Sequence, residues 1–300
     1  MKTMQDLIKA AQLLKPKTLV VAAANDQPVL EAVHMARKAG IIQAVLVGDK
    51  KAIQATLSQL KIPQSDVQII DVADETQACE EAVKLVHKHS GHILMKGFVD
   101  TSVILRAALN RDYGLRTPNR LSHVSVLEIP KYHKIVLMSD GGMNIDPDVD
   151  TKQEIIENGL EIAYALGIKK PNVACIAAVE KINPKMQATL DAEELVSRYR
   201  NGRIKGCAVG GPFGFDNAIN KEAALHKGVT DPMAGNVDFL LMPSIESGNI
   251  FYKSMMFLAG AKSASIIAGA KKPIVLTSRA DATEDKFYSI ALACLVADKQ

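Results

Sequence analysis

The sequence has 300 residues, about twice the usual length of one domain, so we expect two domains. Hydrophobic residues make up 48% and charged residues 23% of the chain, a globular composition that excludes a disordered or collagen-like protein. The 36 Lys and Arg against 33 Asp and Glu leave a net charge of +3, and aromatic residues make up 4%, so we expect no nucleic-acid partner.

The first part of the chain, up to about residue 110, alternates apolar strands with amphipathic helices. Asp26, Asp49 and Asp74 stand where helices should begin, and Gly40 stands where the first of these helices should end. Apolar strands joined by helices predict a parallel sheet covered on both faces. The strands are expected at residues 18–24, 44–47, 67–72 and 92–95.

The pattern changes in the polar stretch 111–120, where we place a domain boundary. Strands are expected at 123–129 and 134–139, and the four-residue link between them predicts an antiparallel β-hairpin. Thr151 and Glu154 then form a capping-box pattern that predicts the start of a helix. Strands and helices alternate again beyond this point, which predicts an α/β fold of mostly parallel sheets around the hairpin. The later strands are expected at 173–179, 207–209, 237–242, 265–268 and 274–277, and the last helix at 281–297.

Three loops follow strand ends, where open α/β sheets bind their ligands. Residues 244–250 contain a glycine that lets the backbone approach a ligand, and successive N–H groups there suit an oxyanion. Arg279 directly follows a buried strand, where a guanidinium can grip phosphate through two parallel hydrogen bonds. An ordinary helix start is the alternative for each loop, and an ion pair with Asp281 or Asp285 is the alternative for Arg279. The third loop follows the strand expected at 92–95, and its Lys, Gly and hydroxyl residues suit an anion. These residues are Lys96, Gly97, Thr101 and Ser102.

Several other features are expected to carry no chemistry. The four cysteines lie far apart with no CxxC pattern, so we expect free core thiols in a reducing cytoplasm. No apolar run approaches the roughly 18 residues that span a bilayer, so we expect no membrane contact. We also expect no metal site, because the local histidines lack a ligand spacing and the acidic run lies at a helix start. These histidines and aspartates are His87, His89, His92, Asp146, Asp148 and Asp150.

Seven stretches, in order and over nearly the whole chain, resemble the phosphate acetyl/butyryltransferase family, and most closely its butyryl branch. The most specific is 273–293 (PIVLTSRADATEDKFYSIALA). Relatives often have Asp where this chain has Ser244, and acetyl-specific relatives have Gly-Cys where this chain has Ala280 and Asp281. The other stretches are 95–109, 121–127, 138–148, 211–219, 247–253 and 261–269.

The resemblance implies the two-domain α/β fold of the isocitrate and isopropylmalate dehydrogenases. The first domain would be discontinuous, with residues 1–119 and 268–300, and the second would comprise residues 120–267. The active site would lie in the cleft between the two domains. The resemblance also implies a homodimer or a larger homo-oligomer.

The implied reaction moves a short-chain acyl group, butyryl-like, reversibly between coenzyme A and inorganic phosphate. The CoA thiol would attack the acyl phosphate directly, with CoA as a substrate and no bound cofactor. Asp285 would act as the base, with Asp281 as the alternative, while Arg279 and Ser278 would hold the phosphate. Substrate binding is assigned to Lys96, Gly97, Thr101, Ser102, Arg106, Gly248 and Asn249.

Three alternatives remain. A phosphate acetyltransferase differs only in the acyl chain, which one residue can redirect. A Mg²⁺-dependent decarboxylating dehydrogenase of the same fold would use aspartates such as Asp146, Asp148 or Asp150 for its metal and would reduce NAD(P). A non-catalytic module that binds acyl-CoA is disfavoured because both Arg279 and Asp285 are present.

Overall fold

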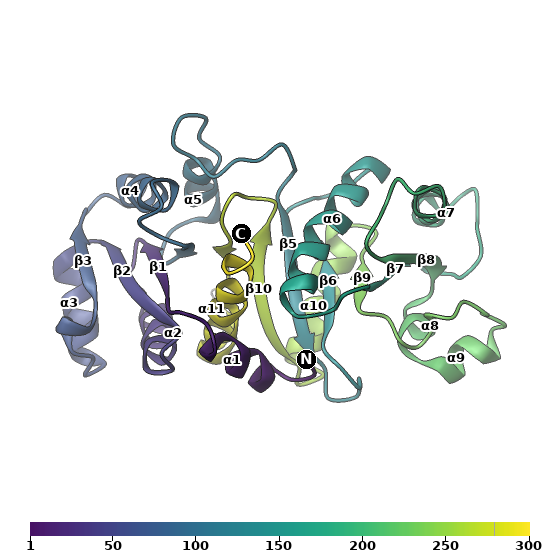
Figure 1. The fold of residues 1–300 in the computed structure, drawn as a ribbon, viewed down its shortest axis with the longest axis horizontal. Helices are drawn as coiled ribbons and strands as arrows, with labels where there is room; N and C mark the ends of the chain where they lie inside the picture. Colours follow the sequence, from purple (N-terminus) through teal and green to yellow (C-terminus); the bar gives the residue numbers. More distant parts are fainter. Residues whose placement is uncertain (279) are drawn as a thin grey trace. The chain divides into compact units, whose positions relative to one another are not determined.

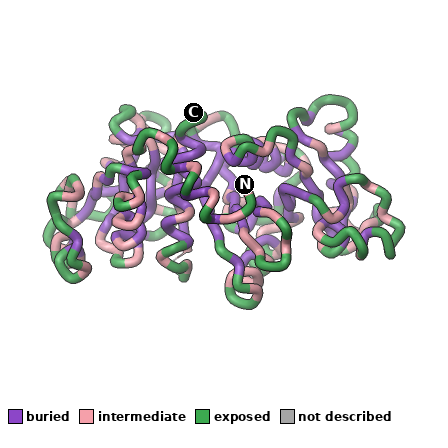
Figure 2. The backbone as a smooth tube through the Cα atoms, turned by 60° about the horizontal axis from the view of Figure 1, so that its bottom comes forward, coloured by how far each residue is buried: buried purple, intermediate pink, exposed green. Residues whose placement is uncertain are grey.

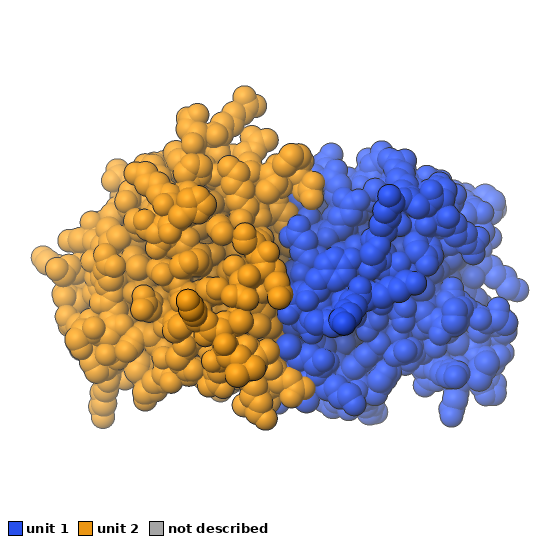
Figure 3. All heavy atoms as spheres, in the orientation of Figure 1, with its two compact units in different colours: residues 1–3, 120–263 blue, residues 4–119, 264–300 orange. Residues whose placement is uncertain are grey.

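The computed structural model describes residues 1–278 and 280–300, and the chain divides into two compact units (Figure 3). Unit 1 comprises residues 1–3 and 120–263, and unit 2 comprises residues 4–119 and 264–300. Each unit has an α/β architecture with a mostly parallel sheet (Figure 1). Strand β10 (Lys262–Ala268) crosses from unit 1 into unit 2, so the predicted domain limit at 267–268 falls inside a strand.

Unit 2 contains six neighbouring strands in the order β3-β2-β1-β4-β11-β10. All neighbours pair in parallel except β10 and β11, which are antiparallel. The bounds of the strands not yet given are β1 Lys17–Ala22, β2 Ile42–Gly48, β3 Gln68–Asp71, β4 Ile93–Lys96 and β11 Ile274–Val275. The parallel sheet predicted from the apolar strands is therefore confirmed.

Three helices of unit 2 begin where the sequence predicted, and α11 (Thr283–Ala297) begins two residues after the predicted start at 281. Asp26, Asp49 and Asp74 are N-caps, and the Asp49 side chain accepts from the N–H groups of Lys51 and Ala52. Gly40 follows the end of its helix with φ of 76°, which a side chain would disfavour. The helices are α1 Met4–Gln12, α2 Gln27–Lys38, α3 Lys50–Gln59, α4 Glu75–His87, α5 Thr101–Ala108 and α11 Thr283–Ala297, with a short 3₁₀ turn at Gln64–Asp66.

Unit 1 contains the predicted β-hairpin, formed by antiparallel β5 (Ser122–Glu128) and β6 (Val136–Ser139). The other pairs are parallel, in the order β5-β6-β9-β7-β8. The further strands are β7 Asn172–Ile176, β8 Ala208–Phe213 and β9 Phe239–Leu241. The helices are α6 Val149–Ala165, α7 Gln187–Arg200, α8 Phe215–Ile219, α9 Lys221–His226 and α10 Ile245–Phe257.

The capping box predicted at Thr151 and Glu154 is wrong. Helix α6 begins two residues earlier, at Val149, and the Asp148 side chain accepts from the Thr151 N–H at 2.8 Å. Glu154 accepts instead from the backbone N–H of Arg120 at 2.8 Å. Asp148 therefore caps the helix in place of Thr151, and the carboxylate of Glu154 binds a backbone N–H that is distant in the sequence.

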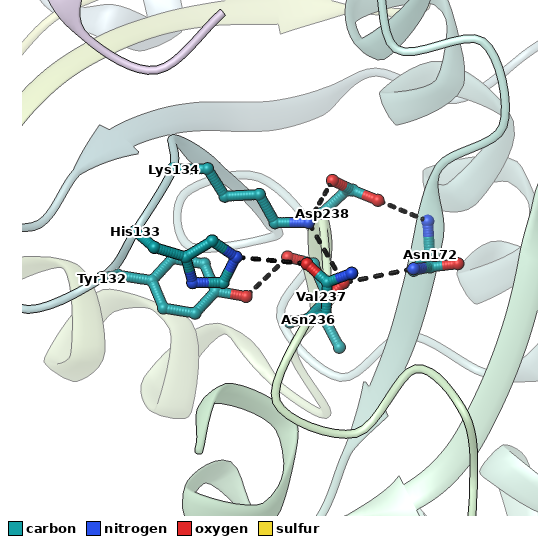
Figure 4. A network of polar contacts seen from close by, with 7 residues as sticks. All are labelled: Tyr132, His133, Lys134, Asn172, Asn236, Val237 and Asp238. Atoms are coloured by element: carbon teal, nitrogen blue, oxygen red, sulfur yellow. Dashed lines mark hydrogen bonds and ion pairs between the residues drawn. The ribbon is translucent and has the colours of Figure 1, made fainter. Parts of the chain in front are cut away.

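A polar network fixes the hairpin link at the amino ends of β7 and β9 (Figure 4). The Lys134 ammonium donates to Asp238 Oδ1 at 2.6 Å and to the Asn236 carbonyl at 3.1 Å. The other Asp238 oxygen accepts from the Asn172 N–H at 2.9 Å, and the Tyr132 hydroxyl donates to the Val237 carbonyl at 2.8 Å. This network lies at the amino ends of the strands, whereas the candidate site loops described below follow the carboxyl ends.

The strands of each unit form its buried core (Figure 2). In unit 1 the side chains of Val136, Phe213 and Leu240 are packed in one cluster, and each is nearly inaccessible to solvent. In unit 2, α11 is buried along most of its length and contacts α1 and α2. Within the described residues, the helices are too short or too polar to cross a bilayer.

Candidate active site

Two loops that the sequence singled out separately lie next to each other in unit 2. Strands β4 and β11 pair in parallel, with Leu94 opposite Ile274 and Met95 opposite Val275. Their carboxyl ends therefore lie side by side, which brings residues 97–100 next to the loop that follows Val275. Loops at such neighbouring strand ends are the usual ligand-binding elements of an α/β sheet.

The loop after β11 forms a tight turn between Ser278 and Asp281. The Ser278 N–H donates to Asp281 Oδ2 at 2.7 Å, and the Asp281 N–H donates back to the Ser278 carbonyl at 3.2 Å. The Ser278 hydroxyl oxygen also accepts from the Ala280 N–H at 3.3 Å. Arg279, the predicted phosphate ligand, lies outside the described residues. The residues on both sides of it are held by this turn.

The two candidate carboxylates have different surroundings. Asp281 uses a carboxylate oxygen to close the turn, which is a structural task. Asp285 is the third residue of α11, and only 6% of it is exposed. A helix N-terminus stabilises the negative charge of a carboxylate in its first turn. Asp281 thus has a structural task in the turn, and the contact of Asp285 with substrate stays a prediction.

Lys286, which the sequence analysis did not single out, lies directly behind the turn. Only 2% of this residue is exposed, and its Nζ donates to the Asp281 carbonyl at 2.6 Å and to the Ser278 carbonyl at 3.1 Å. Desolvation lowers the pKa of the ammonium, and the negative charges of Asp281, Asp26 and Asp285 oppose this shift. The only signal for this residue in the sequence is its place inside the stretch 273–293.

The loop after β4 is held in a similar way by Lys96. Only 6% of this residue is exposed, and its Nζ donates to the Val99 carbonyl at 3.0 Å and the Gly97 carbonyl at 3.2 Å. Gly97 has a packing reason, since an added Cβ would come to 2.7 Å from the Ala22 carbonyl oxygen. Both residues thus have structural tasks, and their predicted contact with substrate stays a prediction.

The remaining predicted residues of unit 2 lie at the surface of α5. Thr101 and Ser102 are exposed in its first turn, and Arg106 is exposed in its last turn. The hydroxyl groups therefore lie at the helix N-terminus that follows β4. Their exposure is compatible with the predicted substrate contacts.

In unit 1, the loop predicted at 244–250 is instead the first part of helix α10. Ser244 is the N-cap and forms a capping box with Ser247. The Gly248 N–H donates to the Ser244 carbonyl at 3.1 Å, as in any helix, so it is already used. Asn249 Nδ2 donates to the Gly141 carbonyl at 3.1 Å. The segment is therefore a helix start, and the predicted substrate contacts of Gly248 and Asn249 stay predictions.

Gly248 is needed because the loop after β6 passes close to α10. A Cβ at this position would come to 3.0 Å from the Gly141 Cα and 2.9 Å from the Asp140 carbonyl carbon. Strands β6 and β9 are parallel neighbours, so the segments that follow them emerge at the same edge of the sheet. The close approach that glycine permits is thus to another backbone segment of unit 1.

Asp140 organises that loop and was not predicted. Its side chain is 2% exposed and accepts four hydrogen bonds. The donors are the backbone N–H groups of His123, Gly142 and Met143 and the side-chain amide of Asn144, at 2.7–3.2 Å. A carboxylate with so many donors has a structural role in fixing the loop.

The discounted metal and thiol candidates have structural explanations. Asp148 caps α6, and Asp150 Oδ1 lies 2.6 Å from Arg198 Nη1. Among the described residues, His, Cys, Asp and Glu side chains form no group of three or more suited to a metal. Burial raises the pKa of the thiols of Cys79, Cys175 and Cys294 to about 12 and of Cys207 to about 11, so they stay protonated at neutral pH.

The model of the phosphate acetyl/butaryl transferase family matches residues 2–92 and 75–294. The chain belongs to this family. A phosphate butyryltransferase of Clostridium beijerinckii is 42% identical over 296 residues, covering 99% of this chain and 98% of that protein. A phosphate acetyltransferase of Thermotoga maritima is 44% identical over 283 residues, covering 94% of this chain and 96% of that protein.

Solved structures agree with this family assignment. A branched-chain phosphotransacylase from Enterococcus faecalis is similar with a TM-score of 0.84 and 33% identity, covering 94% of this chain and 99% of that chain. A 4-hydroxythreonine-4-phosphate dehydrogenase from Klebsiella pneumoniae has a TM-score of 0.56 at 12% identity, covering 94% and 99% of the two chains. The second likeness concerns the fold alone.

Proposed function

We propose that this protein transfers a short-chain acyl group, butyryl in preference, reversibly between coenzyme A and inorganic phosphate. The observation that carries this function is the near full-length match to the family, including a relative named phosphate butyryltransferase at 42% identity. The hydrogen bond between Ser278 and Asp281 and the burial of Asp285 support the assignment of the site to this loop and helix.

In the proposed reaction, the CoA thiol attacks the carbonyl carbon of the acyl phosphate. A C–S bond forms, the C–O bond to phosphate breaks, and Asp285 accepts the thiol proton. A free thiol has a pKa of about 8.5 and is mostly protonated near neutral pH, so a carboxylate that takes the proton as the C–S bond forms assists the attack. Direct attack requires no nucleophile from the protein, which agrees with the raised pKa of every cysteine.

Phosphate is assigned to Arg279 and Ser278. A guanidinium can hold two phosphate oxygens at once and offset the charge that develops as phosphate leaves. The hydrogen-bonded turn supports this assignment because it orders the backbone on both sides of position 279. Lys96, Gly97, Thr101 and Ser102 belong to the neighbouring loop and are the proposed surroundings of the substrate.

Coenzyme A is assigned to Arg106, whose exposed cation suits the phosphates of CoA. Gly248 and Asn249 of unit 1 remain proposed substrate-binding residues. Both lie against the backbone at Gly141, at the carboxyl end of β6. The placement of the active site between domains 1–119 plus 268–300 and 120–267 is part of the same proposal, as is assembly into a homodimer or larger homo-oligomer. The arrangement of the isocitrate and isopropylmalate dehydrogenases is the corresponding proposed fold, supported by the likeness to a dehydrogenase structure.

The release of free thiol from acyl-CoAs of increasing chain length, with and without phosphate, tests the function. We expect release that depends on phosphate and is fastest with four carbons. A maximum at two carbons would favour the acetyl-transferring activity for which the Thermotoga maritima relative is named. Reduction of NAD(P) without any dependence on phosphate would contradict the proposal, as would binding of acyl-CoA without turnover.

A further inference from the structure

Lys286 is an ammonium group in the interior of unit 2 that the proposed chemistry does not use. Its exposed fraction is 2%, and a buried charge is costly unless it is paired and hydrogen-bonded. The partners of Nζ are the carbonyl oxygens of Ser278 and Asp281. These two residues are joined by the hydrogen bonds of the turn after β11.

The helix that carries Lys286 gives the turn a firm support. Helix α11 is buried along most of its length and contacts α1 and α2. Within the turn, the described hydrogen bonds join Ser278 to Asp281 and Ala280 to Ser278. The bonds from Lys286 are of a different kind, because they join the turn to a helix with a fixed position in the core.

The charges around Lys286 suit the same task. Asp26, Asp281 and Asp285 all act on its ammonium, and they lie in the segments around the carboxyl ends of β1 and β11. An ammonium among three carboxylates offsets their mutual repulsion. Replacing it with an apolar side chain would leave two carbonyl groups without these donors and would remove one positive charge near the carboxylates.

We propose that Lys286 is a positioning residue, which fixes Ser278 and Asp281 on α11 and thereby supports the loop to which phosphate binding is assigned. The role toward phosphate rests on the proposed function. The anchoring of the turn does not, because it follows from the hydrogen bonds alone. The two parts are therefore tested by separate measurements.

Hydrogen exchange of a peptide covering residues 276–284 tests the anchoring. Lys286→Met keeps an unbranched chain and removes the donors, so we expect exchange in this peptide to become at least about tenfold faster, while residues 287–297 keep their protection. Lys286→Arg keeps a cationic donor and should restore part of the protection. Should Lys286→Met not fold, Lys286→Gln, which keeps an N–H donor, is measured in the same way. Unchanged exchange in the 276–284 peptide would overturn the inference.

Lys134→Met is the matched control for this measurement. Lys134 also donates to a carbonyl, that of Asn236, and pairs with the carboxylate of Asp238 (Figure 4). It belongs to unit 1 and to the amino ends of the strands. This variant should leave exchange in the 276–284 peptide unchanged, and an equal increase there would show a general loss of stability instead.

A double-mutant cycle with Arg279→Lys tests the role toward phosphate. Lys286→Met should raise KM for phosphate by roughly tenfold or more and change KM for acyl-CoA far less. In the Arg279→Lys background the same change should have little further effect, because residues that act through one another are not additive. Fully additive effects would overturn the role toward phosphate. Wild-type protein without phosphate-dependent turnover would contradict the proposed function, and the exchange result would still decide the anchoring.

Discussion

Several charged side chains near the strand ends of this protein form hydrogen bonds with its own backbone. Lys96 and Lys286 each donate to two carbonyl groups, and Asp140 accepts from three backbone N–H groups. For Lys96, residue types alone leave contact with an anion and an exposed position beside a helix start equally open. The structure gives these side chains a prior task, which is to hold the loops in place.

Asp285→Asn is the substitution that tests the proposed base. It preserves the shape of the side chain and removes the proton acceptor, so kcat for acyl phosphate plus CoA should fall by roughly 10²–10⁴ at neutral pH. KM should change less. Because the CoA thiol ionises without help above its pKa of about 8.5, the variant should recover part of its rate at higher pH.

Profiles of kcat against pH for the wild type, Asp285→Asn and Asp281→Asn test this expected loss and recovery. Asp281→Asn is the comparison because Asp281 closes the turn through a carboxylate oxygen. It should impair phosphate binding without a recovery at high pH. A near wild-type rate for Asp285→Asn at neutral pH would show that Asp285 is not the base.

At the scale of helices and strands, local chemistry predicted most beginnings and ends. Asp49 and Asp74 cap their helices through side-chain oxygens that accept from backbone N–H groups of the first turn, and Asp26 occupies the N-cap position without such a bond. The hairpin between β5 and β6 was also predicted, because two β-rich runs were separated by a short link. These features depend on neighbours in the sequence.

The features that the sequence did not predict share one cause, which is a partner distant in the sequence. Glu154 is drawn away from its predicted cap by the N–H of Arg120. Gly248 and Gly97 are needed because the segments at Asp140 and Ala22 pass close to them. No local pattern contains these contacts. The same reason explains why Asp140 and Lys286 were missed, although both lie in stretches that resemble the family.

The cap of α6 gives a test at this scale. The hydrogen bond from the Thr151 N–H lowers the pKa of Asp148, so its ionised form contributes stability above the unfolded pKa near 3.8, and this stability is lost as pH falls through the lower folded pKa. Asp148→Ala should therefore lower Tm by a few degrees at pH 7 and by progressively less as the pH falls below 3.8. Thermal unfolding of Asp148→Ala and Thr151→Ala across this pH range checks this. A larger loss in Thr151→Ala than in Asp148→Ala at pH 7 would contradict the assigned cap.

At the scale of the whole molecule, each unit presents loops at the carboxyl ends of its parallel strands. Unit 2 presents the segments after β4 and β11, and unit 1 presents those after β6 and β9. The family match extends through both units, from residue 2 to residue 294. The proposed reaction needs both a phosphate site and a CoA site, and the predicted residues for these sites are distributed over these segments.

Exchange of labelled phosphate into butyryl phosphate tests the central claim, which is direct transfer between CoA and phosphate. Direct attack by the CoA thiol releases phosphate only when CoA is present, so we predict that the label enters butyryl phosphate with CoA and not without it. Exchange without CoA would show an acyl-enzyme and would contradict direct transfer. A lack of exchange under both conditions would contradict the proposed acyltransferase itself.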